Sequence, residues 1–150
     1  MVVISRIRRR LLATTIVLGL LLLILDGCHF QPAPVSAYSH SDGAEQIVDV
    51  TIRSSDARTI KRRQFYFSLK IVNCAGPAMG YPARPNIGGD TAGGFDFPIN
   101  GESVLITARV PAKIFAQYAK PCVFLEGGGY LTGTIKSKIV PIQQRFARGT

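Results

Sequence analysis

The sequence has few of the residues on which most catalytic and metal sites depend, and histidine is the clearest case. His29 and His40 are its two histidines, and both lie in a proline- and serine-rich segment with no hydrophobic pattern. A Ser-His-Asp or Cys-His mechanism would therefore have no rigidly held base. A histidine-based metal site would have too few ligands inside the fold. We expect neither a metal nor a cofactor.

Acidic residues are also scarce, with 9 Asp and Glu against 18 Lys and Arg. Charged residues make up 18% of the chain and hydrophobic residues 47%, values too ordinary for a fully disordered protein. The length of 150 residues leaves room for one domain rather than two. We therefore expect one globular domain.

The glycine-rich stretches do not form a phosphate-binding motif. Residues 127–129 are three glycines without the Lys-Ser/Thr ending and following helix of a phosphate loop, so they predict a turn. Asp90 and Asp96 flank a second glycine pair, but aspartates beside glycines are typical of turns. Together with Glu102 they support only an alternative hypothesis, a small hydrolase. Our main expectation is a protein that is not an enzyme.

The apolar run near the N-terminus is short and follows a basic cluster. Four arginines between positions 6 and 10 precede fifteen uncharged residues, Leu11 to Leu25, which is the order found in export signals. Such a helix rises about 22 Å, less than the roughly 30 Å of a bilayer core. Residues 1–27 are therefore predicted to be a signal peptide or an N-terminal membrane anchor. The one-sided arginines would send the rest of the chain across the membrane.

The end of this run resembles the signal of a bacterial lipoprotein. Leu25-Asp26-Gly27-Cys28 has the leucine and the glycine that a lipobox places three and one residues before its cysteine. The resemblance implies cleavage after Gly27 and lipidation of Cys28, whereas Asp26 departs from the small or apolar residue usual at that position. An uncut anchor and cleavage after Ala37 by an ordinary signal peptidase are the alternatives.

The odd number of cysteines agrees with a special role for Cys28. If Cys28 carries a lipid, Cys74 and Cys122 remain as a pair, and thiols of an exported chain tend to oxidise. We predict a disulfide between them. Two buried free thiols are the alternative.

Behind the N-terminal segment, residues 28–45 predict a flexible tether because they are rich in Pro, Ser and Ala. Residues 46–150 predict a single β-domain, in which alternating apolar and polar residues indicate strands. One short helix is predicted between the prolines at 111 and 121. Asn100-Gly101 favours a hairpin. About six strands and one helix predict a mainly β fold, either an antiparallel sandwich or an open barrel. The predicted strands are 47–53, 65–71, 95–99, 104–110, 122–126 and 131–140.

The stretch from residue 76 to 100 is rich in glycine and proline and predicts a long loop. Loops of this length are usually either functional or disordered. The loop is therefore either a contact surface or a mobile segment without a partner. Its candidate contact residues are Met79, Tyr81, Arg84 and Phe95.

Basic residues form two groups along the domain. One lies in a predicted turn before the second strand and the other near the C-terminus. Such groups attract lipid headgroups and anionic envelope polymers, although a solvated loop and a frayed tail are the simpler interpretation. The first group is Arg58, Lys61, Arg62 and Arg63, and the second is Lys136, Lys138, Arg145 and Arg148.

These observations lead to one main functional hypothesis: a non-catalytic, membrane-tethered, extracytoplasmic module that binds another protein of the bacterial envelope. The alternative partner is an anionic polymer or a lipid headgroup bound through the basic groups. Nucleic acid is a poor partner outside the cytoplasm. Under the lipoprotein resemblance, His29 after the lipidated cysteine implies the outer membrane of a double-membraned cell, and otherwise we expect the periplasmic face.

Overall fold

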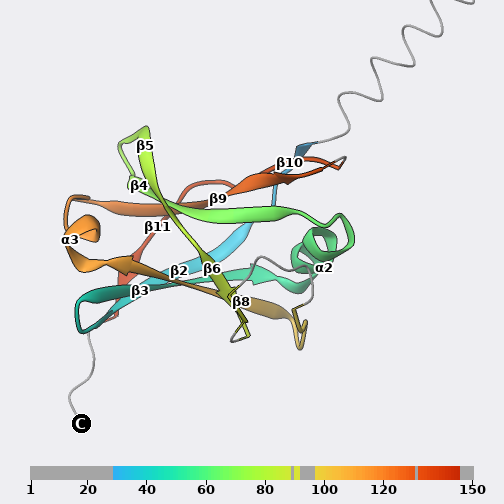
Figure 1. The fold of residues 1–150 in the computed structure, drawn as a ribbon, viewed down its shortest axis with the longest axis horizontal. Helices are drawn as coiled ribbons and strands as arrows, with labels where there is room; N and C mark the ends of the chain where they lie inside the picture. The colour runs from blue at the N-terminus through green and yellow to red at the C-terminus, as the bar shows by residue number, and fades with distance from the viewer. Residues whose placement is uncertain (1–28, 89, 92–96, 131, 146–150) are drawn as a thin grey trace, which may run out of the picture.

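The computed structural model describes residues 29–88, 90–91, 97–130 and 132–145. Over these residues the chain forms two six-stranded sheets that face each other (Figure 1). The predicted mainly β fold is confirmed, and the arrangement is consistent with a sandwich. Most neighbouring strands are antiparallel, but each sheet also contains one parallel pair, β1 with β10 and β12 with β2.

The first sheet has the order β1-β10-β9-β4-β5, with β11 also paired to β9. The second sheet has the order β12-β2-β3-β8-β6-β7. In the first sheet the bounds are β1 His29–Phe30, β4 Tyr66–Asn73, β5 Gly76–Ala83, β9 Pro121–Gly129, β10 Gly133–Lys136 and β11 Val140–Pro141. In the second they are β2 Pro34–Asp42, β3 Glu45–Arg53, β6 Pro85–Ile87, β7 Asp90–Thr91, β8 Ser103–Pro111 and β12 Gln143–Gln144.

The core lies between the sheets and follows the period of two that the strand sequences show. Apolar side chains at alternate positions of β3, β4 and β8 are buried in this core. In β9 the consecutive residues 122–125 are all buried, because Cys122 and Phe124 pack with Val72 in a second, smaller cluster. This burial confirms the strands predicted around 47–53, 65–71, 104–110 and 122–126. The largest fully buried side chains include Ile52, Leu69, Ile71, Ile106 and Leu125.

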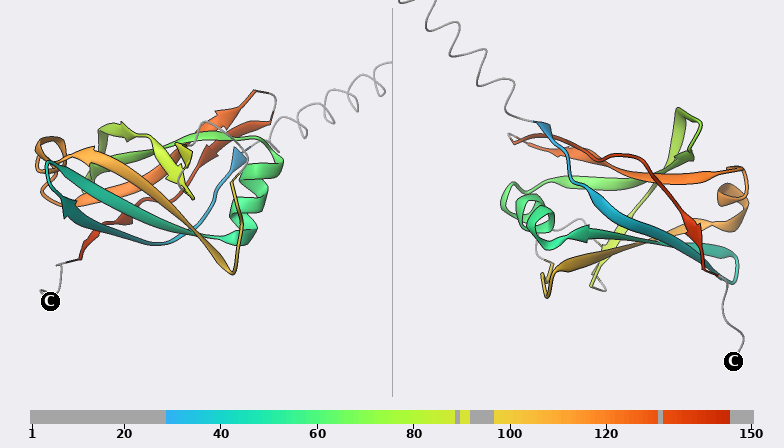
Figure 2. Two further views of the ribbon diagram at one scale, coloured as in Figure 1. Left: turned by 60° about the horizontal axis from the view of Figure 1, so that its bottom comes forward. Right: turned by 180° about the vertical axis from the view of Figure 1, so that it is seen from behind.

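Two helices close the ends of the sandwich (Figure 2). Helix α3 (Ala112–Phe115) lies inside the predicted helix but is shorter, and it buries Phe115. Helix α2 (Ser54–Arg62) stands at the opposite end, where we predicted a turn. The sequence did not indicate α2 because only Ala57 and Ile60 supply apolar contacts to its buried face.

The prediction of a flexible tether at residues 28–45 is wrong for most of this segment. Residues 29–30 and 34–42 form β1 and β2, and β2 pairs with β3 along its whole length. The side chains that β2 turns inward include Ala37 and Ser39, which are too small or too polar to give a hydrophobic period. Cys28 and the predicted signal segment lie outside the described residues.

The prediction of a long loop at residues 76–100 is also largely wrong. Gly76–Ala83 forms the edge strand β5, where prolines are tolerated because the outer N–H groups need no ladder partner. The chain then crosses to the second sheet as β6 and β7. Residues 97–100 form no strand, so the hairpin predicted at Asn100-Gly101 does not form, and β8 pairs with β3 and β6 instead.

The glycines at 127–129 continue β9 rather than making a turn. All three pair with β10, and Gly127 and Gly128 also pair with β4 on the other side. A β-carbon on Gly127 would collide with the Tyr66 carbonyl oxygen, so these glycines allow close approach of neighbouring backbones. The strand predicted at 131–140 is divided into β10 and β11, which are separated by residues 137–139.

The predicted disulfide is confirmed. Cys74, the residue after β4, is bonded to Cys122 in β9, across a sequence separation of 48 residues. The Cys74 N–H also donates to the Lys120 carbonyl at 2.9 Å. Among the residues that the structure describes, no helix is both long enough and apolar enough to span a membrane.

Candidate functional site

The outer face of the second sheet carries a row of polar side chains that crosses five strands. The strand register aligns these residues one beside the next. Asp49, in the middle of the row, makes two side-chain contacts. The Thr107 hydroxyl donates to its Oδ1 at 2.9 Å, and the His40 Nδ1 lies 3.8 Å from its Oδ2. The row consists of Gln143 (β12), Tyr38 (β2), Asp49 (β3), Thr107 (β8) and Asn86 (β6).

Next to this row, Arg109 of β8 is held by two carboxylates. Its Nη1 donates to Glu45 at 2.8 Å and to Asp42 at 3.2 Å. The hydrogen bond to Glu45, followed by that residue's charge, raises the pKa of Arg109 above the ordinary arginine value. Arg109 is therefore a fixed cation at any physiological pH, with its position set by the turn between β2 and β3.

Arg84, between β5 and β6, lies beside Arg109 in the same cleft. The two arginines, together with Asn86 and Thr107, line a cleft of about 400 Å³. The Arg84 side chain is exposed, and within the described part of the chain it makes no ion pair with a carboxylate. The cleft therefore combines one fixed cation and one available cation with an amide and a hydroxyl.

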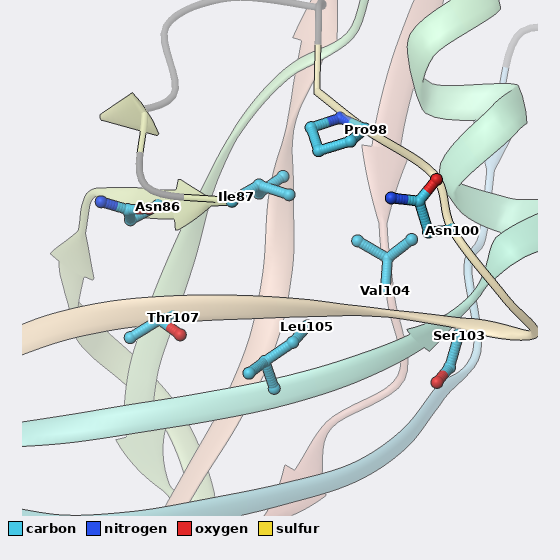
Figure 3. Close-up of a pocket in the computed structure, with 9 residues that line it drawn as sticks. Asn86, Ile87, Pro98, Asn100, Ser103, Val104, Leu105 and Thr107 are labelled. Carbon is cyan, nitrogen blue, oxygen red and sulfur yellow. The ribbon is translucent and has the colours of Figure 1, made fainter.

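A second hollow of about 290 Å³ adjoins the cleft, since both are lined by Asn86 and Thr107. Its other walls include the side chains of Asn100, Ser103 and Leu105 (Figure 3). Leu105 is 52% exposed although it is a large apolar residue. We call the two hollows together the β6–β8 trough; it has a cationic end at Arg84 and Arg109 and a neutral, partly apolar end at Leu105.

The trough has the chemistry of a binding surface. Guanidinium groups recognise carboxylate and phosphate through paired N–H donors, and an exposed apolar side chain beside polar groups is common in contact surfaces. An extended ligand could place an acidic group at the arginine end and an apolar group over Leu105.

The first predicted basic group is brought together by the fold, on a helix rather than a turn. Arg58 and Arg62 are exposed one helical turn apart on α2, and Arg63 caps its C-terminal end. Lys61 is half-buried and donates to the Phe97 carbonyl at 3.2 Å. Two of the four cations, Arg58 and Arg62, are therefore exposed on one helix, whereas Arg63 and Lys61 are half-buried and Lys61 has a structural contact.

The second predicted basic group is separated by the fold. Lys136 lies on β10 in the first sheet, with its Nζ 5.6 Å from the centre of the Phe124 ring. Arg145 follows β12 in the second sheet and lies 4.1 Å above the Tyr38 ring. Lys138 is exposed beyond β10, and Arg148 lies outside the described residues. Lys136 and Arg145 are therefore close in sequence but belong to different sheets.

The candidate residues of the predicted loop also have different environments. Arg84 lines the trough, and Met79 on β5 is 99% exposed. Tyr81 instead packs partly buried against the core, so it is poorly placed as a contact residue. Phe95 lies outside the described residues.

The carboxylates proposed for a hydrolase are not brought together within the described structure. Asp96 and the side chain of Asp90 lie outside it, and Glu102 is exposed on the turn before β8. Over the described ranges, no three His, Cys, Asp or Glu side chains gather as a metal site would require. The hydrolase stays an untested alternative.

Sequence reasoning missed Asn86, Thr107 and Arg109 as site residues. Thr107 and Arg109 occupied recognisable polar positions of the predicted strand 104–110, but alternation shows only that such residues face outward. Which strands lie beside them depends on the pairing of β8 with β3 and β6. No family model, no curated protein and no solved structure matches this chain.

Proposed function

We propose that this chain is a membrane-attached, extracytoplasmic binding module whose β6–β8 trough receives an acidic group of a partner protein in the cell envelope. The observation that carries the proposal is the pair of arginines at one end of the trough, of which Arg84 has no carboxylate partner in the described structure. An exposed arginine beside a shaped, polar cleft favours recognition of a carboxylate.

The Cys74–Cys122 disulfide supports the extracytoplasmic part of the proposal, because structural disulfides persist in oxidising compartments. The fold also bears on the three alternatives for the N-terminus. Ala37 is buried in the middle of β2, so cleavage after it would remove β1 and half of a paired strand. The integrity of the second sheet therefore favours lipidation at Cys28 or an uncut anchor.

Photocrosslinking in intact cells tests the proposal. A photoreactive residue at position 105, in place of the half-exposed Leu105 in the trough, should form an adduct with a specific envelope protein. A matched probe at exposed Lys113, on α3, should not form that adduct.

Charge variants then show whether the adduct depends on the trough. Arg84→Glu should abolish it, because the variant places a second acid where the partner's acid binds. Arg84→Lys should weaken it less, because it keeps the charge but loses the paired donors. An adduct of equal yield in wild type and Arg84→Glu would rule out the trough as the recognition site.

A further inference from the structure

The first described residues are fastened directly to the domain at the end that carries α2. The His29 Nδ1 lies 2.9 Å from the Thr134 Oγ1 on β10, and the Phe30 ring stacks on Phe65 with 6.0 Å between the ring centres. The Ala33 N–H donates to the Asp56 carboxylate of α2 at 3.0 Å. The chain therefore enters the sandwich beside α2 and β10 without a flexible tether.

This attachment leaves little chain between the domain and the predicted membrane segment. From Leu25 to His29 there are four residue steps, which span at most about 14 Å when fully extended. The headgroup layer on each side of a bilayer core takes up roughly 5–8 Å. A domain held by so short a connection must lie against the membrane, and the α2 end is the end that faces it.

The α2 end carries the charge expected of a surface that meets anionic lipid. Residues 53–63 contain five cations and one carboxylate, and that carboxylate, Asp56, is already bonded to the Ala33 backbone. Arg53, Arg58 and Arg62 are exposed. Basic residues this close to an anionic bilayer are attracted to its surface potential.

The same end also exposes tyrosines. Tyr130, at the tip between β9 and β10, is 98% exposed, and Tyr66, the first residue of β4, is 54% exposed. The tip is fixed beside α2 because the Thr132 hydroxyl donates to the Arg63 carbonyl at 2.8 Å. Tyrosine together with arginine is the residue pair typical of membrane interfaces.

We infer that the α2 end of the domain docks on anionic lipid headgroups, with Arg58 and Arg62 contacting phosphates and Tyr130 inserting into the interface. This inference rests on the membrane attachment in the proposed function. It also sets the direction of the β6–β8 trough. Arg109 is held by the turn between β2 and β3, at the opposite end from α2 (Figure 1), so the cationic end of the trough is directed away from the bilayer.

Because the chain contains no tryptophan, a single introduced tryptophan reports on docking. The full chain carrying Tyr130→Trp is reconstituted into phosphatidylcholine vesicles with or without phosphatidylglycerol, both containing brominated lipid as a quencher. The matched control is Met79→Trp, which replaces an equally exposed residue on β5. The fluorescence of the Tyr130→Trp chain should be quenched and blue-shifted in the phosphatidylglycerol vesicles, and that of the Met79→Trp chain should not.

Charge reversal on α2 then tests the electrostatic part. Each arginine contributes about fivefold, so the loss of two arginines alone should lower the ratio of docked to undocked domain roughly thirtyfold. The two carboxylates that Arg58→Glu/Arg62→Glu introduces are repelled by the anionic surface and should make the drop larger. The matched control is Lys113→Glu/Lys120→Glu, which makes the same charge change at exposed positions near the other end. It should leave docking unchanged, and added salt should weaken docking in the wild type.

Equal quenching of the Tyr130→Trp and Met79→Trp chains, equal effects of the two charge reversals, or equal quenching with and without phosphatidylglycerol would each overturn the inference. Flotation of the same samples separates it from the proposed function. A chain that floats with vesicles but shows no selective quenching contradicts only the orientation. A chain that does not float contradicts membrane attachment as well.

Discussion

Replacing Ser137 with alanine tests how the first sheet is held together between β10 and β11. These strands pair with opposite ends of β9, and Leu125 lies between the two pairings. Ser137 fills this gap: its N–H donates to the Leu125 carbonyl, and its Oγ accepts from the Leu125 N–H, both at 2.9 Å. Without the hydroxyl, the N–H of a fully buried residue has no acceptor. This change should lower the free energy of unfolding by about 1–3 kcal/mol.

A second contact of Ser137 contributes little to that figure. Its Oγ donates to the Lys138 carbonyl at 2.8 Å, but Lys138 is exposed, so water can replace the hydroxyl there. The loss of stability therefore comes from the unpaired Leu125 N–H alone. We expect Ser137→Ala to lower the free energy of unfolding by about 2 kcal/mol, the middle of the range for a buried unpaired group.

Ser39→Ala is the matched control and should have the opposite sign. Ser39 on β2 is fully buried, and its Oγ has no hydrogen-bond partner within the described structure. Burying a hydroxyl without a partner costs about 1–3 kcal/mol in mutational data, and alanine removes only that group. We therefore expect Ser39→Ala to raise the free energy of unfolding by about 1 kcal/mol.

Urea unfolding of both variants in detergent, followed by circular dichroism, measures the two effects. At equal slopes against urea concentration, the difference in midpoint reports the difference in stability. We expect the two variants to differ by about 3 kcal/mol. The reasoning is refuted if both substitutions shift stability in the same direction, or if Ser137→Ala costs less than roughly 0.5 kcal/mol, the usual effect at a surface site.

Two further predictions concern the same β9 strand. Reducing the Cys74–Cys122 disulfide, which closes a loop with a sequence separation of 48 residues, should lower the free energy of unfolding by about 4 kcal/mol, measured by urea unfolding with and without reductant; equal stabilities would contradict this. Gly127→Ala should cost about 3 kcal/mol or more, because its β-carbon would collide with the Tyr66 carbonyl oxygen, whereas Gly76→Ala, with open space around it, should be nearly neutral in the same assay.

The sequence predicted those strands whose inward residues are large and apolar. β3, β4 and β8 were found because Val, Ile, Leu and Phe alternate with polar residues along them, whereas the first part of β9 is a short apolar run without alternation. β2 was not found, since it turns Ala37 and Ser39 inward. β5 was not found either, because its prolines are acceptable only at a sheet edge, and the sequence does not show which strands are edges.

The candidate site was predicted only in part, for a similar reason. Arg84 was selected because it lies in an unusual Gly- and Pro-rich stretch, but its partners in the trough come from β6 and β8. A tertiary contact between residues about 25 positions apart leaves no local pattern. The basic residues of α2 were recognised as a group, whereas their helix was not, because α2 is stabilised by tertiary packing of Ala57 and Ile60 rather than by a long apolar face.

Composition and local pattern by themselves determined that this chain is mainly β and that much of the interior is built from alternate residues of a few strands, and they predicted the Cys74–Cys122 disulfide that the structure confirms. These properties depend on side-chain period, cysteine number and burial, which act along the chain. Only the tertiary structure decided which arginines lie together on the polar face, that three successive glycines continue a strand, and that residues 29–30 and 34–42 belong to the sheets. Those outcomes depend on which backbones become neighbours, and strand pairing across long sequence separations is fixed by the packing of the whole domain.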